Sequence, residues 1–158
     1  MPAGGLMKLS TFLKVDDIIP GLTAESKEEV LKELAGRVAE RHPDLDRAEL
    51  LKTLLERERL GSTGIGDGIA IPHGKLKRLE KPLLAFGRSQ AGVDYNSLDG
   101  RKVNLLFLML APENAVGLHL KMLARISRIL KDAEVRKGLV EAPDATAILE
   151  IIRKQDSY

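Results

Sequence analysis

Apolar residues recur at helical spacing in the first third of the chain and predict two helices there. Behind Ser26 one stripe contains Val30, Leu31, Leu34, Ala35 and Val38. A second stripe follows Asp46 and contains Leu50, Leu51, Leu54 and Leu55. Ser26 and Asp46 are each followed three residues later by a glutamate, which is the order of a helix-capping box. The first helix should end near His42, because Pro43 follows, and Gly61 should stop the second.

In the middle of the chain the pattern changes to short apolar runs separated by glycines and turns, which is typical of β-strands. A glycine-rich segment at residues 61–68 precedes a short alternating run at residues 69–72. Residues 83–87 are predicted to form a strand. Residues 103–111 are apolar almost throughout, as expected of a central strand covered on both faces, and Pro112 should end it.

Helical spacing returns in the last third of the chain. A long helix is predicted over residues 116–131, and its apolar positions are Leu118, Met122, Leu123, Ile126, Ile129 and Leu130. Two short helices are predicted around residues 135–140 and 145–154. Helices at both ends with strands between them predict a single α/β domain over residues 1–158, with a mixed β-sheet flanked by helices on both faces. Residues 1–7 are expected to form a flexible N-terminal extension.

Composition narrows the class of protein without identifying a function. The chain has 158 residues, 44% of them hydrophobic, which is enough for one real core. Its longest apolar stretch, residues 105–112, is much shorter than the roughly 20 residues of a membrane helix. The opening residues lack the apolar core of a signal peptide. There is no cysteine, which excludes disulfides, thiolate chemistry and cysteine-bound zinc. We expect a cytoplasmic protein that does not insert into a membrane.

The charge pattern shows no footprint of a nucleic-acid partner. The net charge is +2, and positive and negative residues are interleaved along the chain. The densest basic stretch, with Lys75, Lys77, Arg78 and Lys81, is short and lacks aromatic side chains for base stacking. We interpret it as a solvated loop, and a docking surface for an acidic partner is the alternative.

His73 is the leading candidate for a reactive residue. It stands between Pro72 and Gly74, where an apolar run leaves the glycine-rich segment. The glycine leaves the imidazole uncrowded, so that a large partner can approach it. An unperturbed imidazole titrates near pH ~6.5, so much of it is the nucleophilic neutral form at neutral pH. Attack on phosphorus would give a high-energy phosphoramidate suited to onward transfer. The alternative is a histidine that only makes a hydrogen bond at a strand end.

Two further side chains fit a phosphoryl site. His119 lies in the first turn of the helix predicted over residues 116–131, on its apolar stripe, so it should face the protein interior. A helix N-terminus there favours negative charge nearby. Arg57 closes the second predicted helix, and its planar guanidinium suits phosphate oxygens. The simpler alternatives are a core histidine bonded to a carbonyl and a solvated arginine. His42, near a helix C-terminus, is interpreted as structural.

The glycine-rich segment fits no common nucleotide-binding pattern. Neither G-x-G-x-x-G nor G-x-x-x-x-G-K-[ST] runs through residues 61–68. Successive N–H groups in such a loop can still form an anion-binding concavity, and Ser62 and Thr63 add hydroxyls. Ser62, Thr63 and Gly64 are therefore candidate phosphate-binding residues, and a tight surface loop is the alternative.

Residues 57–75 read RERLGSTGIGDGIAIPHGK, and this segment resembles the active-site segment of the enzyme IIA components of the bacterial phosphotransferase system. The resemblance is to the fructose/mannitol class, and most closely to its nitrogen-regulatory type. It extends from the first predicted helix through Leu118-His119-Leu120 to the end of the chain. It implies a mixed sheet between helices, with Arg57 and His119 flanking a phosphoryl group on His73.

The resemblance also implies the partners. An HPr-like phosphocarrier, itself charged from phosphoenolpyruvate by an enzyme I, would phosphorylate His73 without a metal or organic cofactor. Sugar-transporting relatives pass the group to an enzyme IIB, whereas nitrogen-type relatives control other proteins through their phosphorylation state. The motif is nearer to the nitrogen type, and the chain contains no IIB or IIC segment, so we expect a regulatory role.

Three alternatives stay open. A sugar-transport enzyme IIA would use the same histidine. A non-catalytic switch would bind partner proteins and never be phosphorylated. A metal hydrolase would use His73 and His119 with Asp67, but no H-E-x-x-H or similar spacing supports it.

Overall fold

The apolar run near residue 105 forms the centre of a six-stranded mixed sheet in the computed structural model, which describes residues 8–156. The predicted extension at residues 1–7 lies outside the described residues. The sheet order is β1-β5-β6-β3-β2, and β4 also pairs with β6. The central strand, β6 (Val103–Pro112), is antiparallel to β5 and parallel to β3 and β4. The strand thus extends one residue past the predicted end and includes Pro112.

The helices and strands follow one another along the chain as follows: η2 (Leu9–Thr11), η3 (Val15–Asp17), β1 (Ile18–Ile19), α1 (Lys27–Arg41), α2 (Arg47–Arg59), β2 (Gly64–Gly66), β3 (Ile69–Ala70), β4 (His73–Leu76), β5 (Leu83–Val93), β6 (Val103–Pro112), α3 (Val116–Lys131), α4 (Ala133–Glu141) and α5 (Ala145–Gln155).

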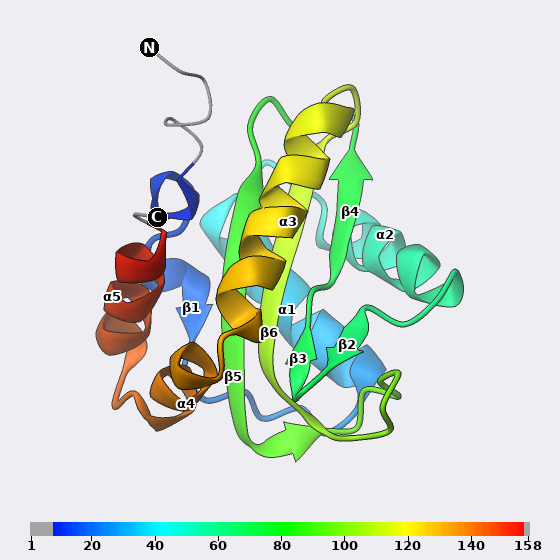
Figure 1. Cartoon of the computed structure of the whole chain (residues 1–158). Helices are drawn as coiled ribbons and strands as arrows, with labels where there is room; N and C mark the ends of the chain where they lie inside the picture. The colour runs from blue at the N-terminus through cyan, green and yellow to red at the C-terminus, as the bar shows by residue number, and fades with distance from the viewer. Residues whose placement is uncertain (1–7, 157–158) are drawn as a thin grey trace.

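Helices cover both faces of the sheet, because β6 is apolar on both of its sides. Leu105, Phe107 and Met109 join one core with α3, α4 and α5. The alternate residues, Leu106, Leu108 and Leu110, join a second core with α1 and α2. In Figure 1, α3 crosses the front of the sheet and α1 lies behind it. The predicted α/β class, a mixed sheet flanked by helices on both faces, is confirmed.

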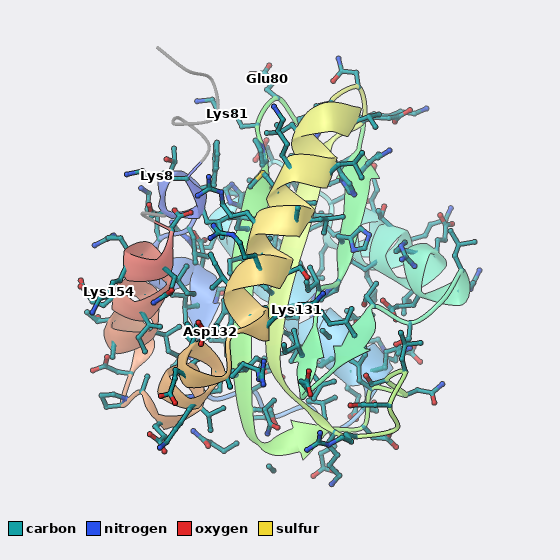
Figure 2. The ribbon with its side chains drawn as sticks, viewed as in Figure 1. Lys8, Glu80, Lys81, Lys131, Asp132 and Lys154 are labelled. Carbon is teal, nitrogen blue, oxygen red and sulfur yellow. The ribbon has the colours of Figure 1, made fainter. Side chains whose placement is uncertain are left out.

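The charged residues labelled in Figure 2 lie on the outside of these layers. Glu80 and Lys81 lie at the tip of the loop that joins β4 to β5. Asp132 lies between α3 and α4 and caps α4, where its carboxylate accepts hydrogen bonds from the N–H groups of Glu134 and Val135. Among the residues that the structure describes, no helix is long and apolar enough to span a bilayer.

The predicted helices are confirmed, and three strands add to the predicted set. Ser26 caps α1 through the N–H of Glu29, and Asp46 caps α2 through the N–H of Ala48. Strand β1 was not predicted, and strand β2 lies inside the glycine-rich segment. Strand β4 includes Lys75, which was expected to lie in a solvated loop. These strands are only two to four residues long, and backbone pairing rather than side-chain pattern sustains them.

Candidate active site

His73 is the first residue of β4 and makes two hydrogen bonds through its ring. Its position is set by backbone pairing with β6, where it stands opposite Met109. Its Nδ1 lies 2.8 Å from the carbonyl oxygen of Ile71. Its Nε2 lies 3.3 Å from Nε of Arg57, which donates to it. A carbonyl only accepts and a guanidinium only donates, so both contacts require the proton on Nδ1 and the lone pair on Nε2.

Arg57 lies in the last turn of α2 and links the imidazole to the loop that follows. Its Nη1 donates to the carbonyl oxygen of Gly61 at 2.9 Å. Gly61 has φ of 149°, a left-handed backbone conformation that favours glycine. The chain therefore turns sharply beneath the guanidinium, and the same turn ends the helix near the predicted residue.

His119 lies in the first turn of α3 and faces the interior, as predicted from its place on the apolar stripe. Its side chain is buried, with 6% of the residue exposed. Its ring centroid lies 5.3 Å from that of His73, and the two planes meet at 62°. Its Nδ1 is buried and has no hydrogen-bond partner among residues 8–156. Figure 1 shows β4 between α2 and the N-terminal half of α3, which is how the three side chains meet.

The three predicted side chains line one open hollow of about 390 Å³. Its other lining residues are Thr53, Glu56, Leu60, Gly74 and Lys75. Lys75 lies two residues after His73 in β4, so both side chains leave the same face of the strand. The hollow thus contains two imidazoles, two cationic side chains and one carboxylate, that of Glu56; the cations outnumber the carboxylate, which favours an anion.

Burial and neighbouring cations favour the neutral form of both imidazoles. Burial lowers the pKa of His73; its bond to the Ile71 carbonyl raises the pKa, Arg57 lowers it and Glu58 raises it, and the net direction is down. Burial likewise lowers the pKa of His119, and the charges on His73, Lys75 and Arg57 add to the effect. At neutral pH the Nε2 lone pair of His73 is therefore free of a proton.

The structure does not bring the predicted loop residues into this hollow. The N–H of Thr63 donates to Glu58 at 3.1 Å, and the Thr63 hydroxyl also contacts that carboxylate. The N–H of Gly64 donates to the Ser62 hydroxyl at 3.0 Å. These donors are already used within the protein, because the segment continues into strand β2 instead of opening into an anion cradle. Ser62, Thr63 and Gly64 support the site from outside the hollow.

Gly74 has a packing role that the sequence did not predict. A Cβ at this position would lie 2.6 Å from Cγ2 of Thr53. The missing side chain therefore lets α2 pack closely on β4, and Gly74 also lines the hollow beside the imidazole. Close packing of these two elements places Arg57 beside His73.

Sequence reasoning missed Glu58, Lys27 and Tyr95, which lie next to the site. Glu58 follows Arg57 and is 5% exposed at its side chain. One signal was available, because a carboxylate in the last turn of a helix faces the negative end of the helix dipole and needs other partners. No local signal marks Lys27 or Tyr95, since each meets Glu58 from a distant part of the chain.

Asp67 and His42 lie apart from the two site histidines. Asp67 borders a separate hollow with Arg136 and Glu141. His42 is the C-cap residue of α1, where its N–H donates to the carbonyl of Val38, in agreement with a structural role. Within residues 8–156 no three side chains of His, Cys, Asp or Glu gather as a metal-binding group.

The chain is similar to known proteins over most of its length. A nitrogen regulatory protein of Bradyrhizobium diazoefficiens is 44% identical over 146 residues, covering 92% of this chain and 95% of that protein. The fructose-specific EIIABC component of the Bacillus subtilis phosphotransferase system is 41% identical over 150 residues, covering 95% of this chain and 24% of that protein.

The fold has a close counterpart among solved structures. The crystal structure of the nitrogen regulatory protein IIA-Ntr from Neisseria meningitidis superposes with a TM-score of 0.86 at 32% identity, covering 91% of this chain and 98% of that one. Residues 11–155 match the family described as phosphoenolpyruvate-dependent sugar phosphotransferase system, EIIA 2. The chain belongs to this EIIA 2 family of the phosphotransferase system.

Proposed function

We propose that His73 accepts a phosphoryl group from an HPr-like phosphocarrier protein in the cytoplasm, and that the phosphorylated chain serves nitrogen or metabolic regulation. The observation that carries the proposal is the state of the His73 ring. Its proton is committed to the Ile71 carbonyl, and its Nε2 lone pair borders an open hollow beside Arg57, Lys75 and His119. A half-buried neutral imidazole in such a hollow is a nucleophile that a second protein can reach.

In the proposed step the Nε2 lone pair forms a bond to phosphorus while the donor's bond to phosphorus breaks. The electron pair of the broken bond returns to the donor protein. The proton on Nδ1 stays at the Ile71 carbonyl, so the product ring is positively charged beside a phosphoryl dianion. As proposed, the step needs no metal or organic cofactor, because positioning and charge stabilisation carry most of a phosphoryl transfer.

Arg57 and His119 have separate proposed tasks. In the unphosphorylated protein the Nε–H of Arg57 donates a hydrogen bond to Nε2 of His73. As the new bond to phosphorus forms, this N–H must donate to a phosphoryl oxygen instead. Its second bond, to the Gly61 carbonyl, keeps the guanidinium nearby during this shift. His119 retains an unpartnered ring nitrogen within an imidazole that packs on His73, and a phosphoryl group would offer it an acceptor.

The similar proteins support a regulatory role and leave sugar transport as a second candidate. A relative named a nitrogen regulatory protein is 44% identical and matches over nearly its whole length. The fructose-specific relative is 41% identical, but this chain corresponds to only 24% of it. In a sugar-transport role, phospho-His73 would pass its group to an enzyme IIB.

Labelling with phosphoenolpyruvate, enzyme I and an HPr-like phosphocarrier tests the proposal. We expect the chain to gain a single acid-labile phosphate that is absent from His73→Ala, with ³¹P NMR showing the phosphorus on Nε2. His42→Ala is the matched control, because His42 is a partly exposed histidine at a helix end far from the hollow, and it should label like the wild type.

The outcomes separate the candidate functions. Equal labelling of wild type and His73→Ala would refute the proposal, and no labelling of either would favour a pure protein-binding switch. Adding a fructose-type enzyme IIB to the labelled chain tests the second candidate. Rapid loss of phosphate to the IIB would favour sugar transport over regulation.

A further inference from the structure

Glu58 makes a concentrated set of polar contacts just outside the hollow. Its carboxylate lies 3.0 Å from Nζ of Lys27 and accepts hydrogen bonds from the Thr63 N–H at 3.1 Å and the Tyr95 hydroxyl at 3.3 Å. The Thr63 hydroxyl contacts the same carboxylate and lies 2.9 Å from the Tyr95 hydroxyl. None of these residues lines the hollow beside His73.

Because this network is buried, its polar groups need hydrogen-bond partners within the protein. Glu58 is 5% exposed at its side chain, and Tyr95 is completely buried. A buried carboxylate is costly unless it is paired and hydrogen-bonded, and here each requirement is met. Burial and the nearby Glu58 charge raise the pKa of Tyr95, so its hydroxyl keeps the proton that it donates. Nζ of Lys27 also lies 4.9 Å from the centroid of the Tyr95 ring, in a cation–π contact that adds to the hydrogen bonds of the hydroxyl.

Thr63 connects this network to the reactive imidazole through the backbone. Its carbonyl oxygen accepts a hydrogen bond from the N–H of Ile71 at 2.9 Å. The carbonyl oxygen of Ile71 in turn accepts from Nδ1 of His73 at 2.8 Å. A displacement of Thr63 therefore moves the group that fixes the proton on His73.

The same loop also holds Arg57. Gly61, two residues before Thr63, accepts a hydrogen bond from Nη1 of Arg57 through its carbonyl. Glu58 and Arg57 are neighbours in the last turn of α2, so their side chains leave the helix in different directions. In the loop over residues 61–63, the Glu58 carboxylate therefore binds Thr63 and the Arg57 guanidinium binds Gly61.

We propose that Glu58 and Tyr95 are positioning residues, which fix Thr63 and thereby set the tautomer of His73 and the place of Arg57. The inference rests on the proposed phosphoryl transfer, and it adds residues that act without touching the phosphoryl group. We expect them to act on the chemical step and not on donor binding, because none of them lines the hollow beside His73.

Tyr95→Phe is the sharpest test, since it removes one hydroxyl and keeps the buried ring and every charge. Glu58→Gln is the companion variant. Both should lower the turnover number of phosphoryl transfer by about tenfold, the effect of one lost hydrogen bond to a charged group, while KM for the phosphorylated donor stays within about twofold. Imidazole ¹⁵N NMR of the unphosphorylated Tyr95→Phe protein should show a mixture of His73 tautomers where the wild type shows Nδ1–H alone.

Asp156→Asn is the matched control. Its carboxylate is also buried and bonded, to Arg125 at 2.9 Å and to the Ser10 N–H at 3.0 Å, but it lies at the end of α5. It should lose stability while keeping transfer within about twofold of wild type. If Tyr95→Phe lowers stability but leaves turnover and the His73 tautomer at wild-type values, the proposal is overturned.

The two readouts also separate this inference from the proposed function. A wild type that never accepts phosphate refutes the function, while the NMR measurement still reports whether Tyr95 positions His73. Should Glu58→Gln fail to fold, the Tyr95→Phe result decides alone.

Discussion

At the scale of single residues, the two hydrogen bonds of His73 determine which of its ring nitrogens carries the proton. The Ile71 carbonyl requires a proton on Nδ1, and Arg57 occupies the lone pair on Nε2. The same arginine lowers the pKa of His73, although burial contributes more to the shift. Arg57 therefore both occupies this lone pair in the resting protein and favours its unprotonated form, and we propose that it then stabilises the charge of the transferred group.

Substitution of Arg57 tests this dual role. Arg57→Gln should slow phosphorylation of His73 by about 100-fold, as expected when one preorganised donor to a developing charge is lost. It should also raise the pKa of His73, because a neighbouring positive charge has been removed. Stopped-flow transfer assays and an NMR titration measure the two effects.

Arg59 provides the control for Arg57. It lies two residues further along α2, is exposed and does not line the hollow beside His73. Arg59→Gln removes the same charge from the same helix end and should leave the transfer rate within about twofold of wild type. Equal slowing by both variants would mean that general electrostatics, and not the placed guanidinium, assists the transfer.

At the scale of elements, the contact between α2 and β4 sets the geometry of the site. Helix α2 carries Arg57 and strand β4 carries His73, and Gly74 meets Thr53 where they touch. Strand β4 is held in turn by its pairing with β6, which is buried on both faces. His73 therefore lies on a strand paired directly with the buried central strand, whereas the position of Arg57 depends on how closely α2 approaches β4.

A methyl group at Gly74 should disturb that approach. Gly74→Ala places a Cβ 2.6 Å from Cγ2 of Thr53. Such overpacking should lower the free energy of unfolding by about 1–3 kcal/mol and slow transfer by displacing α2. Chemical denaturation and the labelling assay measure both effects.

The double variant Thr53→Ala/Gly74→Ala should recover much of both losses, because it removes the clashing methyl group. Gly21→Ala is the control, since a Cβ at Gly21 meets no atom within 4 Å. A Gly74→Ala protein as stable and as active as wild type would show that α2 does not depend on this glycine.

At the scale of the whole molecule, the site histidines couple stability to pH. The pKa values of His73 and His119 are lowered in the folded protein from 6.5 in the unfolded chain. Between the folded and unfolded values the unfolded state binds more protons, so stability falls as pH falls below about 6.5. The loss levels off once the pH is below the folded pKa values.

Urea denaturation between pH 7 and pH 5 should therefore show a free energy of unfolding that decreases with acidity. The decrease should be smaller in His119→Gln, which lacks one of the two groups. A wild-type protein whose stability is constant over this window would contradict the lowered pKa values of the pair.

Local patterns predicted most of the fold. Helical spacing located α1, α2 and α3, and capping residues marked the starts of α1 and α2, because those signals lie within a few consecutive residues. The apolar run at residues 103–111 located the central strand for the same reason. Strand β4 escaped prediction, since Gly74 and Lys75 have little strand propensity and only pairing with β6 holds them extended.

The order of residues was enough to predict that His73, Arg57 and His119 lie together, because a resemblance over residues 57–75 and residue type carry that information. What required the folded chain was their surroundings. The Tyr95 hydroxyl donates to Glu58, 37 residues away in the sequence; Thr63 bonds to both of them outside the hollow; and Gly74 packs against Thr53 of α2. Such contacts join distant segments at distances of a few ångströms, and no local pattern encodes them, since they exist only once the sheet and its helices have packed together.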